Sequence, residues 1–485
     1  MKNKIVYIST LAILAITPGC KKYLEQLPDQ RTEVNSPVKV AELLSTAYPR
    51  ANYIPFLEAM SDNAEDKGTD VNALINRQPW FFQDVTNRDE DTPDFYWHSA
   101  YAAIAAANQA LEVIDNATDQ SAYAASRGEA LVARAYAHFM LVTIFAKAYD
   151  PATAGKDPGI PYVTKTEKVV IEKYERKTVA YVYEQIEKDL LEGLSLIDDN
   201  SYTGAPAFHF TTKAAHAFAS RFYLFKKEYA KVVQHANLTF VGTKALPYLR
   251  PVNTLYAQME RLVLQAEYTK ATTKANLLLV ETKSVWARDL VTNRYGCTPS
   301  LARNFIVANN VCGTGFDYSF YYSDPEDFFL PKFNELFIRV DQNANIGDPY
   351  DMVPLFSAEE VLFNRAEANT ELGNFDAAIK DLNDFVSQRA VDYDPAEHNL
   401  TPDKISNYYQ TLDIKAGLIS TILDFKRMEF VFEGLRWFDI LRHKLPVNHI
   451  SFDGKTRLVL GPNDPRRMVQ IPQEAQLSGL ELNPR

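Results

Sequence analysis

Two separate segments of this chain repeat one helix–turn–helix pattern, and this repetition limits the folds that the chain can adopt. Residues 214–236 and 360–386 each contain apolar side chains at helical spacing, a short turn, and a second helical stretch. Small side chains where paired helices touch let two backbones approach closely. Matching positions carry an aromatic residue before the second helix and alanines at the expected contacts: Tyr229, Ala217 and Ala230 in the first segment, Phe375, Ala366 and Ala378 in the second.

Helical periodicity extends over much of the remaining chain. Residues 100–115, 127–149 and 178–197 carry further apolar rows at helical spacing, and Thr178 is placed to cap the third of these helices. The pair Leu372-Gly373 is typical of tetratricopeptide helix pairs. The repeats are scattered between long insertions, which argues against a regular solenoid. We predict a mostly α-helical protein in which about four tetratricopeptide-like helix pairs form one wall of an irregular domain.

Two segments lack this periodicity and are predicted to be rich in loops. Residues 245–350 contain prolines, asparagines and β-branched residues, which indicate loops with short strands and minor helices. Residues 62–98 are predicted to form a second loop, which carries the aromatic run Trp80-Phe81-Phe82. The chain is therefore expected to combine a helical wall with a loop-rich region.

Composition excludes some classes of protein. Of the 485 residues, 46% are hydrophobic, which is ample for a buried core, so an intrinsically disordered chain is not expected. The formal net charge is −11 and no basic stripe is present, which argues against a nucleic-acid-binding protein.

The N-terminus has the features of a secretion signal. Lys2 and Lys4 precede the apolar run 5–16, which is shorter than the roughly 20 residues that a membrane span needs but has the size of a signal-peptide core. Small residues and then Cys20 are typical of the cleavage site of bacterial lipoproteins, although Thr17 stands where leucine is usual. We expect residues 1–19 to be removed and Cys20 to become the lipid anchor of the outer membrane. Ordinary secretion with an incidental Cys20 is the alternative.

Residues 429–443 combine large apolar and ionisable side chains. At roughly 100° per residue on a helix, the apolar side chains fall on one arc and most charged ones on the opposite side. Glu433, Arg436, Asp439 and Arg442 alternate in sign at spacings of three, so neighbours can form ion pairs. A catalytic site would need two carboxylates that converge with separated pKa values, which one helix face does not provide. We predict one amphipathic packing helix with a charge network.

The same stretch resembles the closing signature of the SusD/RagB family, the surface nutrient-binding lipoproteins of Bacteroidetes. Other landmarks of that family follow in order along the chain, from LEQLP after Cys20 to Asn483-Pro484, so the resemblance covers essentially the whole chain. The family's usual Phe-Gly pair is Phe145-Ala146 here, and the chain ends at Arg485 before the usual last residues. The signature positions are Arg427, Glu429, Phe432, Glu433, Gly434, Arg436, Trp437, Phe438, Asp439 and Arg442.

The resemblance implies a fold, a location and a role. It implies one SusD-like domain over residues 20–485, with an N-terminal half over 20–245 and a C-terminal half over 246–485. Such a protein is expected at the outer-membrane surface, as a lid on a SusC-like, TonB-dependent transporter. Its helix-pair side would face that transporter, and its loop side would bind an oligosaccharide or polysaccharide, or a peptide in some branches. The resemblance implies neither catalysis nor a cofactor.

The loops supply the candidate ligand contacts. A sugar site needs flat aromatic faces for the pyranose rings and polar side chains for the hydroxyls. The alternative for each aromatic is a place in the core, where it buries about 150–250 Å². The run 318–322 is the preferred candidate because Gly313, Gly315 and Pro325 flank it. The candidates, inferred from residue type and loop setting, are Trp80, Phe81, Phe82, Trp97, Trp286, Asn309, Asn310, Tyr318, Phe320, Tyr321 and Tyr322.

Other chemistry has weaker support in the sequence. Asp89, Glu90, Asp91 and Asp94 offer oxygen ligands for calcium but lack EF-hand spacing, so a solvated loop is the preferred interpretation and no metal is predicted. The residues leave open whether Cys297 and Cys312 form a disulfide or remain thiols. No hydrolase motif is present, although the fold could still bring two carboxylates together. A tetratricopeptide scaffold that binds other proteins is a further alternative.

Overall fold

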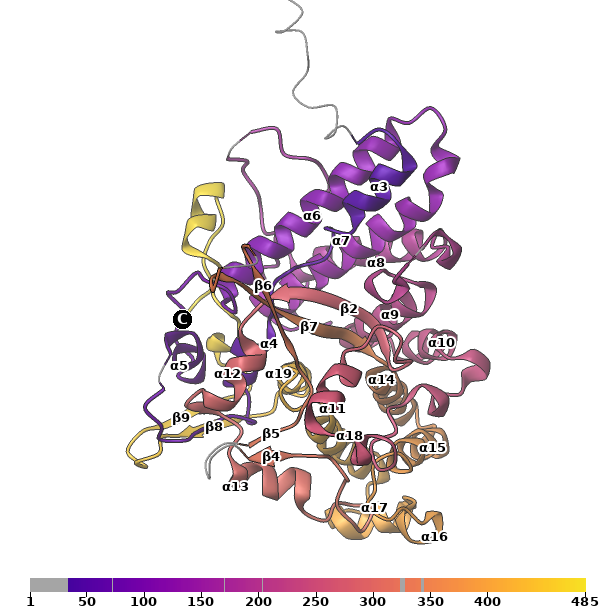
Figure 1. The fold of residues 1–485 in the computed structure, drawn as a ribbon, viewed down its shortest axis with the longest axis vertical. Coiled ribbons are helices and arrows are strands. Elements are labelled where there is room, and N and C mark those ends of the chain that lie inside the picture. The colour runs from indigo at the N-terminus through magenta and orange to yellow at the C-terminus, as the bar shows by residue number, and fades with distance from the viewer. Residues whose placement is uncertain (1–33, 72, 170, 203, 323–327, 342–343) are drawn as a thin grey trace, which may run out of the picture.

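The computed structural model describes residues 34–485 except 72, 170, 203, 323–327 and 342–343 (Figure 1). The predicted signal sequence and Cys20 therefore lie outside the described residues. The principal helices are α3 (Pro37–Leu44), α4 (Ile54–Met60), α5 (Leu74–Trp80), α6 (Pro93–Asp115), α7 (Ala124–Phe145), α8 (Val179–Leu194), α9 (Thr212–Lys226), α10 (Tyr229–Thr239), α11 (Arg261–Tyr268), α12 (Trp286–Thr292), α13 (Pro299–Ala302), α14 (Ala358–Glu371), α15 (Phe375–Val386), α16 (Pro395–His398), α17 (Pro402–Tyr409), α18 (Ile414–Glu429) and α19 (Leu435–Arg442).

Paired helices form one side of the molecule. Helix α6 packs on α7, α7 on α8, α9 on α10, α14 on α15, and α17 on α18. In Figure 1 these pairs follow one another from α6 and α7 at the top to α15 and α17 at the bottom, while most strands lie on the other side. The predicted mostly α-helical architecture with helix pairs and a strand-containing, loop-rich region is confirmed.

Small residues line the seams between these helices. Ala217, Ala366 and Ala378 are completely buried, as predicted. Ala230 is exposed, so its predicted place in a seam is wrong: it lies in the first turn of α10, and Ala236 occupies the buried face instead. Helices α7 and α8 approach so closely that a Cβ at Gly193 would lie 2.8 Å from the carbonyl oxygen of Gly128.

Side-chain caps fix where several helices begin. The Thr178 hydroxyl accepts a hydrogen bond from the amide of Tyr181 at 3.2 Å, so the predicted cap of α8 is confirmed. Thr92 caps α6 in the same way, with Pro93 in the first helical position. Helix α6 thus begins seven residues before the predicted range, and α5 occupies part of the segment predicted as the loop 62–98. That prediction is wrong for residues 74–80 and 93–98.

The segment 245–350 contains strands as well as loops. Strand β7 (Gly347–Ser357) pairs antiparallel with β2 (Asn276–Lys283) on one side and with β6 (Glu335–Arg339) on the other. Strand β7 has 11 residues, longer than the short strands that we predicted. The remaining strands form two-stranded ribbons: β1 (Glu65–Asp66) with β3 (Tyr295–Gly296), β4 (Tyr321–Tyr322) with β5 (Phe328–Phe329), and β8 (Val447–Ile450) with β9 (Arg457–Leu460).

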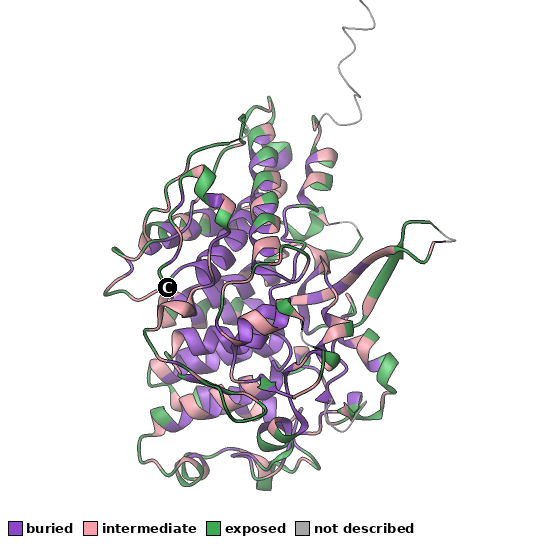
Figure 2. Ribbon diagram, turned by 90° about the vertical axis from the view of Figure 1, so that its left-hand side faces the viewer, coloured by how far each residue is buried: buried purple, intermediate pink, exposed green. Residues whose placement is uncertain are grey.

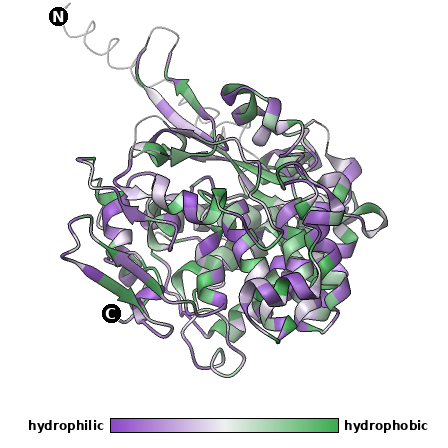
Figure 3. Ribbon diagram, turned by 90° about the horizontal axis from the view of Figure 1, so that it is seen from below, coloured by the Kyte–Doolittle hydropathy of each residue, from purple (hydrophilic) through white to green (hydrophobic). Residues whose placement is uncertain are grey.

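One large hydrophobic core runs from Val40 to Leu480 and draws on both the helices and the three-stranded sheet. Buried positions concentrate in the helical body (Figure 2), and hydrophobic and hydrophilic residues interleave along the helices (Figure 3). Among the described helices, Gln120–Phe145 alone is long and apolar enough to cross a membrane. Because its apolar window is entirely buried in this core, it is weak evidence for a membrane span.

The signature segment, residues 427–442, is not the single helix that we predicted. Helix α18 ends at Glu429, and α19 begins at Leu435 after a turn. Phe432 and Gly434 both have φ = 71°, which an α-helix does not allow. The carboxylate of Glu58 on α4 stabilises this turn, because it accepts the backbone amides of Phe432 at 2.9 Å and Gly434 at 3.0 Å.

Most charged residues of the signature segment are buried, Arg427 and Arg442 are half-buried, and most of their partners come from elsewhere in the chain. Arg436 binds Asp62 at 2.8 and 2.9 Å, Arg442 binds Glu367 at 2.8 and 2.7 Å, and Glu433 accepts from Lys332 at 2.6 Å. Of the expected ion pairs between neighbours three residues apart, only the contact of Arg442 with Asp439, at 3.2 Å, is present among the described residues. Asp439 also accepts a hydrogen bond from Lys426. The charges therefore join segments of the core.

The two cysteines that the sequence left undecided are both free thiols, and both are buried. Burial raises the pKa of the Cys297 thiol well above its ordinary range, which keeps this group protonated and unreactive at neutral pH.

Candidate functional site

Six of the predicted ligand contacts are buried. Trp80, Trp286, Trp97, Phe82 and Asn310 expose 5% of their surface or less, and Tyr318 exposes 9%. A ligand on the outside of this structure does not reach such side chains, so their burial argues against the predicted contacts and favours the alternative role in the core. The remaining candidates are Phe320, Tyr322 and Asn309, which are exposed, and Phe81 and Tyr321, which are half-buried.

The buried tryptophans have structural roles that the sequence did not reveal. The ring of Trp80 stacks on His449 of β8 with a centroid separation of 4.8 Å, and Phe82 stacks on the same imidazole at 4.9 Å. The indole nitrogen of Trp286 donates to the carbonyl oxygen of Phe432 at 3.1 Å. These rings attach the loop-rich region to the C-terminal part of the chain.

Tyr318 belongs to the central charge network. Its hydroxyl donates to Glu429, which also accepts two hydrogen bonds from Arg389 at 2.8 and 2.9 Å. Arg389 is completely buried and also binds Glu359 at 3.2 Å. Sequence reasoning missed Arg389 because no motif identifies it.

The exposed aromatic candidates lie on or beside the ribbon formed by β4 and β5. Phe320 and Tyr322 lie 5.7 Å apart, centroid to centroid, and both contact Phe328, at 5.8 and 6.0 Å. Phe328 is buried against Phe432 at 6.2 Å. We call Phe320, Tyr321 and Tyr322 the aromatic platform. The buried ring of Phe328 packs against Phe320 and Tyr322, whereas Tyr321 stacks on Phe329 at 5.8 Å.

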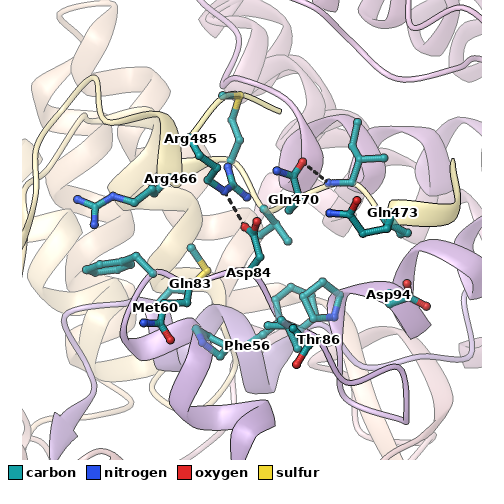
Figure 4. A pocket seen from close by; sticks show the side chains of 18 of the residues that line it. Phe56, Met60, Gln83, Asp84, Thr86, Asp94, Arg466, Gln470, Gln473 and Arg485 are labelled. Carbon is teal, nitrogen blue, oxygen red and sulfur yellow. Dashed lines mark hydrogen bonds and ion pairs between the residues drawn. The ribbon is translucent and has the colours of Figure 1, made fainter. Parts of the chain in front are cut away.

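Sequence reasoning did not find a recess beneath the C-terminal segment. This pocket has a volume of about 200 Å³. Its apolar lining includes Phe56 and Met60 (Figure 4). Arg485, the last residue, donates to Asp84 at 2.6 Å across this pocket, and Arg466 and Gln470 lie near its rim (Figure 4). The pocket brings together residues 82–94, which include the start of α6, and residues 466–485, which lie far apart in the sequence.

A larger cleft of about 470 Å³ lies between α6, the loop 161–174 and residues 474–480. This volume falls in the range typical of small-molecule sites, about 300–1,000 Å³. Tyr101, Ile104 and Ile171 contribute to an aromatic and apolar lining, and His98, Lys165 and Glu474 add polar groups.

A charged cluster contributes to the walls of both cavities. Atoms of Asp94, His98 and Glu474 lie within 4.8 Å of one another, the sole such set of three potential metal ligands among the described residues. Arg88 binds Glu474 at 2.7 Å and lies 4.0 Å from Asp94, so a guanidinium already supplies positive charge here. We therefore assign no metal. The calcium alternative also loses support, because Asp91 points to α12 while Asp94 faces His98.

Two buried carboxylates flank Ser284 at the start of α12. Asp91 accepts the amide of Val285 and Asp351 accepts the amide of Ala287, each at 2.8 Å. The second oxygen of each carboxylate has no hydrogen-bond partner. Burial, with smaller contributions from the negative charges of Asp351 and Glu90, raises the pKa of Asp91 to about 8. Burial raises the pKa of Asp351 to about 7.

These carboxylates predict a loss of stability at high pH. Each is protonated in the folded protein and ionised in the unfolded chain between about pH 4 and its folded-state pKa, so folding takes up protons in this window. The contribution to the free energy of unfolding therefore decreases as the pH rises from 4 to 8. We expect Asp91→Asn to flatten this decrease and to stabilise the protein at pH 8 by about 1–3 kcal/mol. Denaturant titrations of both proteins from pH 5 to 8.5 check this, and parallel pH profiles would contradict it.

A family model described as "Starch-binding associating with outer membrane" matches residues 22–224, and a model described as "SusD family" matches residues 333–473. No curated protein sequence matches the chain.

Solved structures resemble the whole fold. A SusD-like carbohydrate binding protein from Bacteroides vulgatus is 17% identical, with a TM-score of 0.65 over 92% of this chain and 96% of that one. A SusD superfamily protein from Bacteroides thetaiotaomicron is 18% identical, with a TM-score of 0.61 over 93% and 100%. A SusD-like carbohydrate binding protein from Bacteroides fragilis is 16% identical, with a TM-score of 0.60 over 92% and 98%. At these identities the similarity concerns the fold.

Proposed function

Because this chain belongs to the SusD/RagB family, we propose that it is a nutrient-binding lipoprotein of the outer-membrane surface. In this proposal Cys20 carries the lipid anchor, and the protein delivers its ligand to a SusC-like, TonB-dependent transporter. Family membership supports a nutrient-binding role at the outer membrane. The signal-like N-terminus supports the anchor.

The proposed ligand is an oligosaccharide or polysaccharide, and the proposed contact is the aromatic platform. The observation that carries this proposal is the exposure of Phe320 and Tyr322 above the buried ring of Phe328. Two exposed rings that contact a buried ring suit the apolar faces of pyranoses, and loop positions are where binding residues commonly occur. Asn309 remains a candidate for hydroxyl groups because it is exposed. Half-buried Phe81, beside Arg77 at 5.0 Å, is a secondary candidate.

We propose that the protein binds its ligand without chemical change. Carboxylates within and beside the signature segment, such as Asp439 and Glu367, bind lysine or arginine side chains. Asp94 and Glu474, at the cavities, share Arg88 and His98. Carboxylates occupied by cations in this way do not offer the free acid–base pair that glycoside hydrolysis requires.

A peptide ligand is the second candidate, and the cleft beside α6 favours it. Its apolar lining fits a hydrophobic side chain, while Lys165 at its polar part suits the carboxylate end of a short peptide. Because a sugar is expected on the platform and a peptide in the cleft, the two candidates make different predictions for the same variants.

Binding measurements distinguish these candidates. We expect calorimetric titration with a panel of glycans to find a ligand whose Kd rises about 3- to 10-fold in Tyr322→Ala, because an aromatic contact contributes about 0.5–1.5 kcal/mol. Tyr408→Ala is the matched control: Tyr408 is 49% exposed, Tyr322 is 48% exposed, and Tyr408 lies on α17. Binding of oligopeptides alone, weakened by Ile171→Glu in the cleft and unaffected by Tyr322→Ala, would favour the peptide, and Ile171 is exposed so that this change leaves the core intact. Ligand cleavage by the purified protein would contradict a purely binding role.

A further inference from the structure

Strand β6 leaves one edge of the three-stranded sheet without a partner strand among the described residues. The strand order is β2-β7-β6, so β6 is an edge strand. Its hairpin with β7 projects from the body of the protein, and much of the projecting part is exposed (Figure 2). Leu336, Phe337 and Ile338 expose 42%, 43% and 51% of their surfaces, and Val340 just beyond the strand exposes 68%. Exposed apolar edge strands readily pair with another strand, and proteins usually protect them.

The sequence of β6 is complementary to itself. The strand reads Glu335-Leu336-Phe337-Ile338-Arg339, with opposite charges at its two ends and apolar residues between them. If two copies pair antiparallel about Phe337, Glu335 of each copy lies opposite Arg339 of the other. Leu336 then lies opposite Ile338. Side chains opposite one another across antiparallel strands interact directly, and opposite charges there are favourable.

The backbone permits the same arrangement. Val340 donates its amide to the carbonyl of Ile346 at 3.0 Å, so this residue directs its hydrogen-bonding amide toward β7. Because the direction alternates along an antiparallel strand, Glu335, Phe337 and Arg339 direct their amides and carbonyls away from β7. Pairing centred on Phe337 places these three residues opposite Arg339, Phe337 and Glu335 of the second copy. All six outward amides would then find carbonyl acceptors.

We propose that two copies of this chain associate through β6, forming one continuous six-stranded sheet around a twofold axis. The occupant of the free edge is a second copy because the strand matches itself in charge, in apolar residues and in hydrogen-bonding direction. The contact is small, since it involves a single short strand from each copy, so it describes a weak dimer. Both carboxylate oxygens of Glu335 already bind Arg288 of its own chain, at 2.7 and 2.9 Å, so Arg339 of the other copy would join an existing ion pair.

Charge reversal tests this pairing. We expect sedimentation velocity to show concentration-dependent dimers of the unaltered protein. Glu335→Arg and Arg339→Glu should each be monomeric, because like charges then oppose each other in each homodimer. A mixture of the two variants should dimerise again, since the arginines of one strand then face the glutamates of the other. Melting curves of each variant alone verify that the fold is intact, and restored dimerisation in the mixture cannot come from unfolding.

A cysteine placed on the twofold axis gives a second measurement. The Cα atoms of a hydrogen-bonded antiparallel pair lie about 5.5 Å apart, within the range that a disulfide spans. Phe337→Cys should therefore form a disulfide-linked dimer under mild oxidation. Leu412→Cys is the control, because Leu412 is fully exposed and lies in the connection between α17 and α18. An unaltered protein that stays monomeric at high concentration, or equal cross-linking of both variants, would overturn the proposal.

Discussion

Replacement of Arg389 by methionine is expected to lower the free energy of unfolding by about 3–5 kcal/mol at pH 7. Arg389 is completely buried and donates hydrogen bonds to Glu429, to Glu359 and to the carbonyl of Arg250, the last at 2.6 Å. Methionine has a similar length but neither charge nor donors. The substitution leaves Glu429 buried with the hydroxyl of Tyr318 as its main remaining side-chain partner. Loss of one partner of a buried ion pair costs more than the pair itself contributes.

The effect of Arg389→Met should depend on pH in a specific direction. Burial alone would raise the pKa of Glu429, but Arg389 holds this pKa below its ordinary value of 4.5. In the native protein the pair therefore stabilises the fold above about pH 4.5, and this contribution is lost as the pH falls. In the variant, burial dominates and Glu429 becomes easier to protonate. We expect the difference in stability between the two proteins to be larger at pH 7 than at pH 5.

Denaturant titration at the two pH values measures this effect. Lys380→Met is the control, because Lys380 is 68% exposed and its ion pair with Asp384 lies on the surface of α15. It should change the free energy of unfolding by no more than about 0.5 kcal/mol. If Arg389→Met lowers the free energy of unfolding at pH 7 no more than this control does, Arg389 is not needed to stabilise the buried charges of Glu429 and Glu359.

Replacement of Trp437 by alanine should lower the free energy of unfolding by about 3–5 kcal/mol. Trp437 lies in α19 and is completely buried, so alanine leaves a cavity where the indole was. The indole nitrogen has no hydrogen-bond partner. Trp437→Phe keeps most of the ring volume and removes this unsatisfied donor, so it should cost less than half as much. The two variants therefore separate packing from hydrogen bonding.

Thermal and denaturant unfolding of both Trp437 variants provide the measurement, together with ligand titration. Stability should fall in the order native, Trp437→Phe, Trp437→Ala, while the Kd of the folded protein for its ligand stays unchanged. A Trp437→Ala protein of native stability that has lost its ligand would instead place this tryptophan in the binding site.

The helices were largely predictable, whereas the exposure of the aromatic candidates was not. Apolar spacing of three and four residues is a local property, and it gave α7, α9, α10, α14 and α15 with boundaries close to those observed. The loop 62–98 was predicted less well, because Thr92 and Pro93 begin α6 early and α5 contains Pro79. Trp80 and Tyr322 both lie in segments that the sequence predicts to be loops. The ring of Trp80 is nevertheless fully buried, whereas Tyr322 is 48% exposed.

The sequence by itself determined the mostly helical class, the helix pairs and the family resemblance, since these depend on spacings within single segments. The tertiary structure alone decided which rings face solvent and which charges form pairs. Arg436 binds Asp62, 374 positions away, and the imidazole of His449 lies 2.7 Å from the backbone carbonyl oxygen of Trp80, 369 positions away. Such partners meet only when the core assembles, because buried charges and polar atoms must be satisfied by whichever segments the fold brings beside them. No periodicity along the chain encodes that choice.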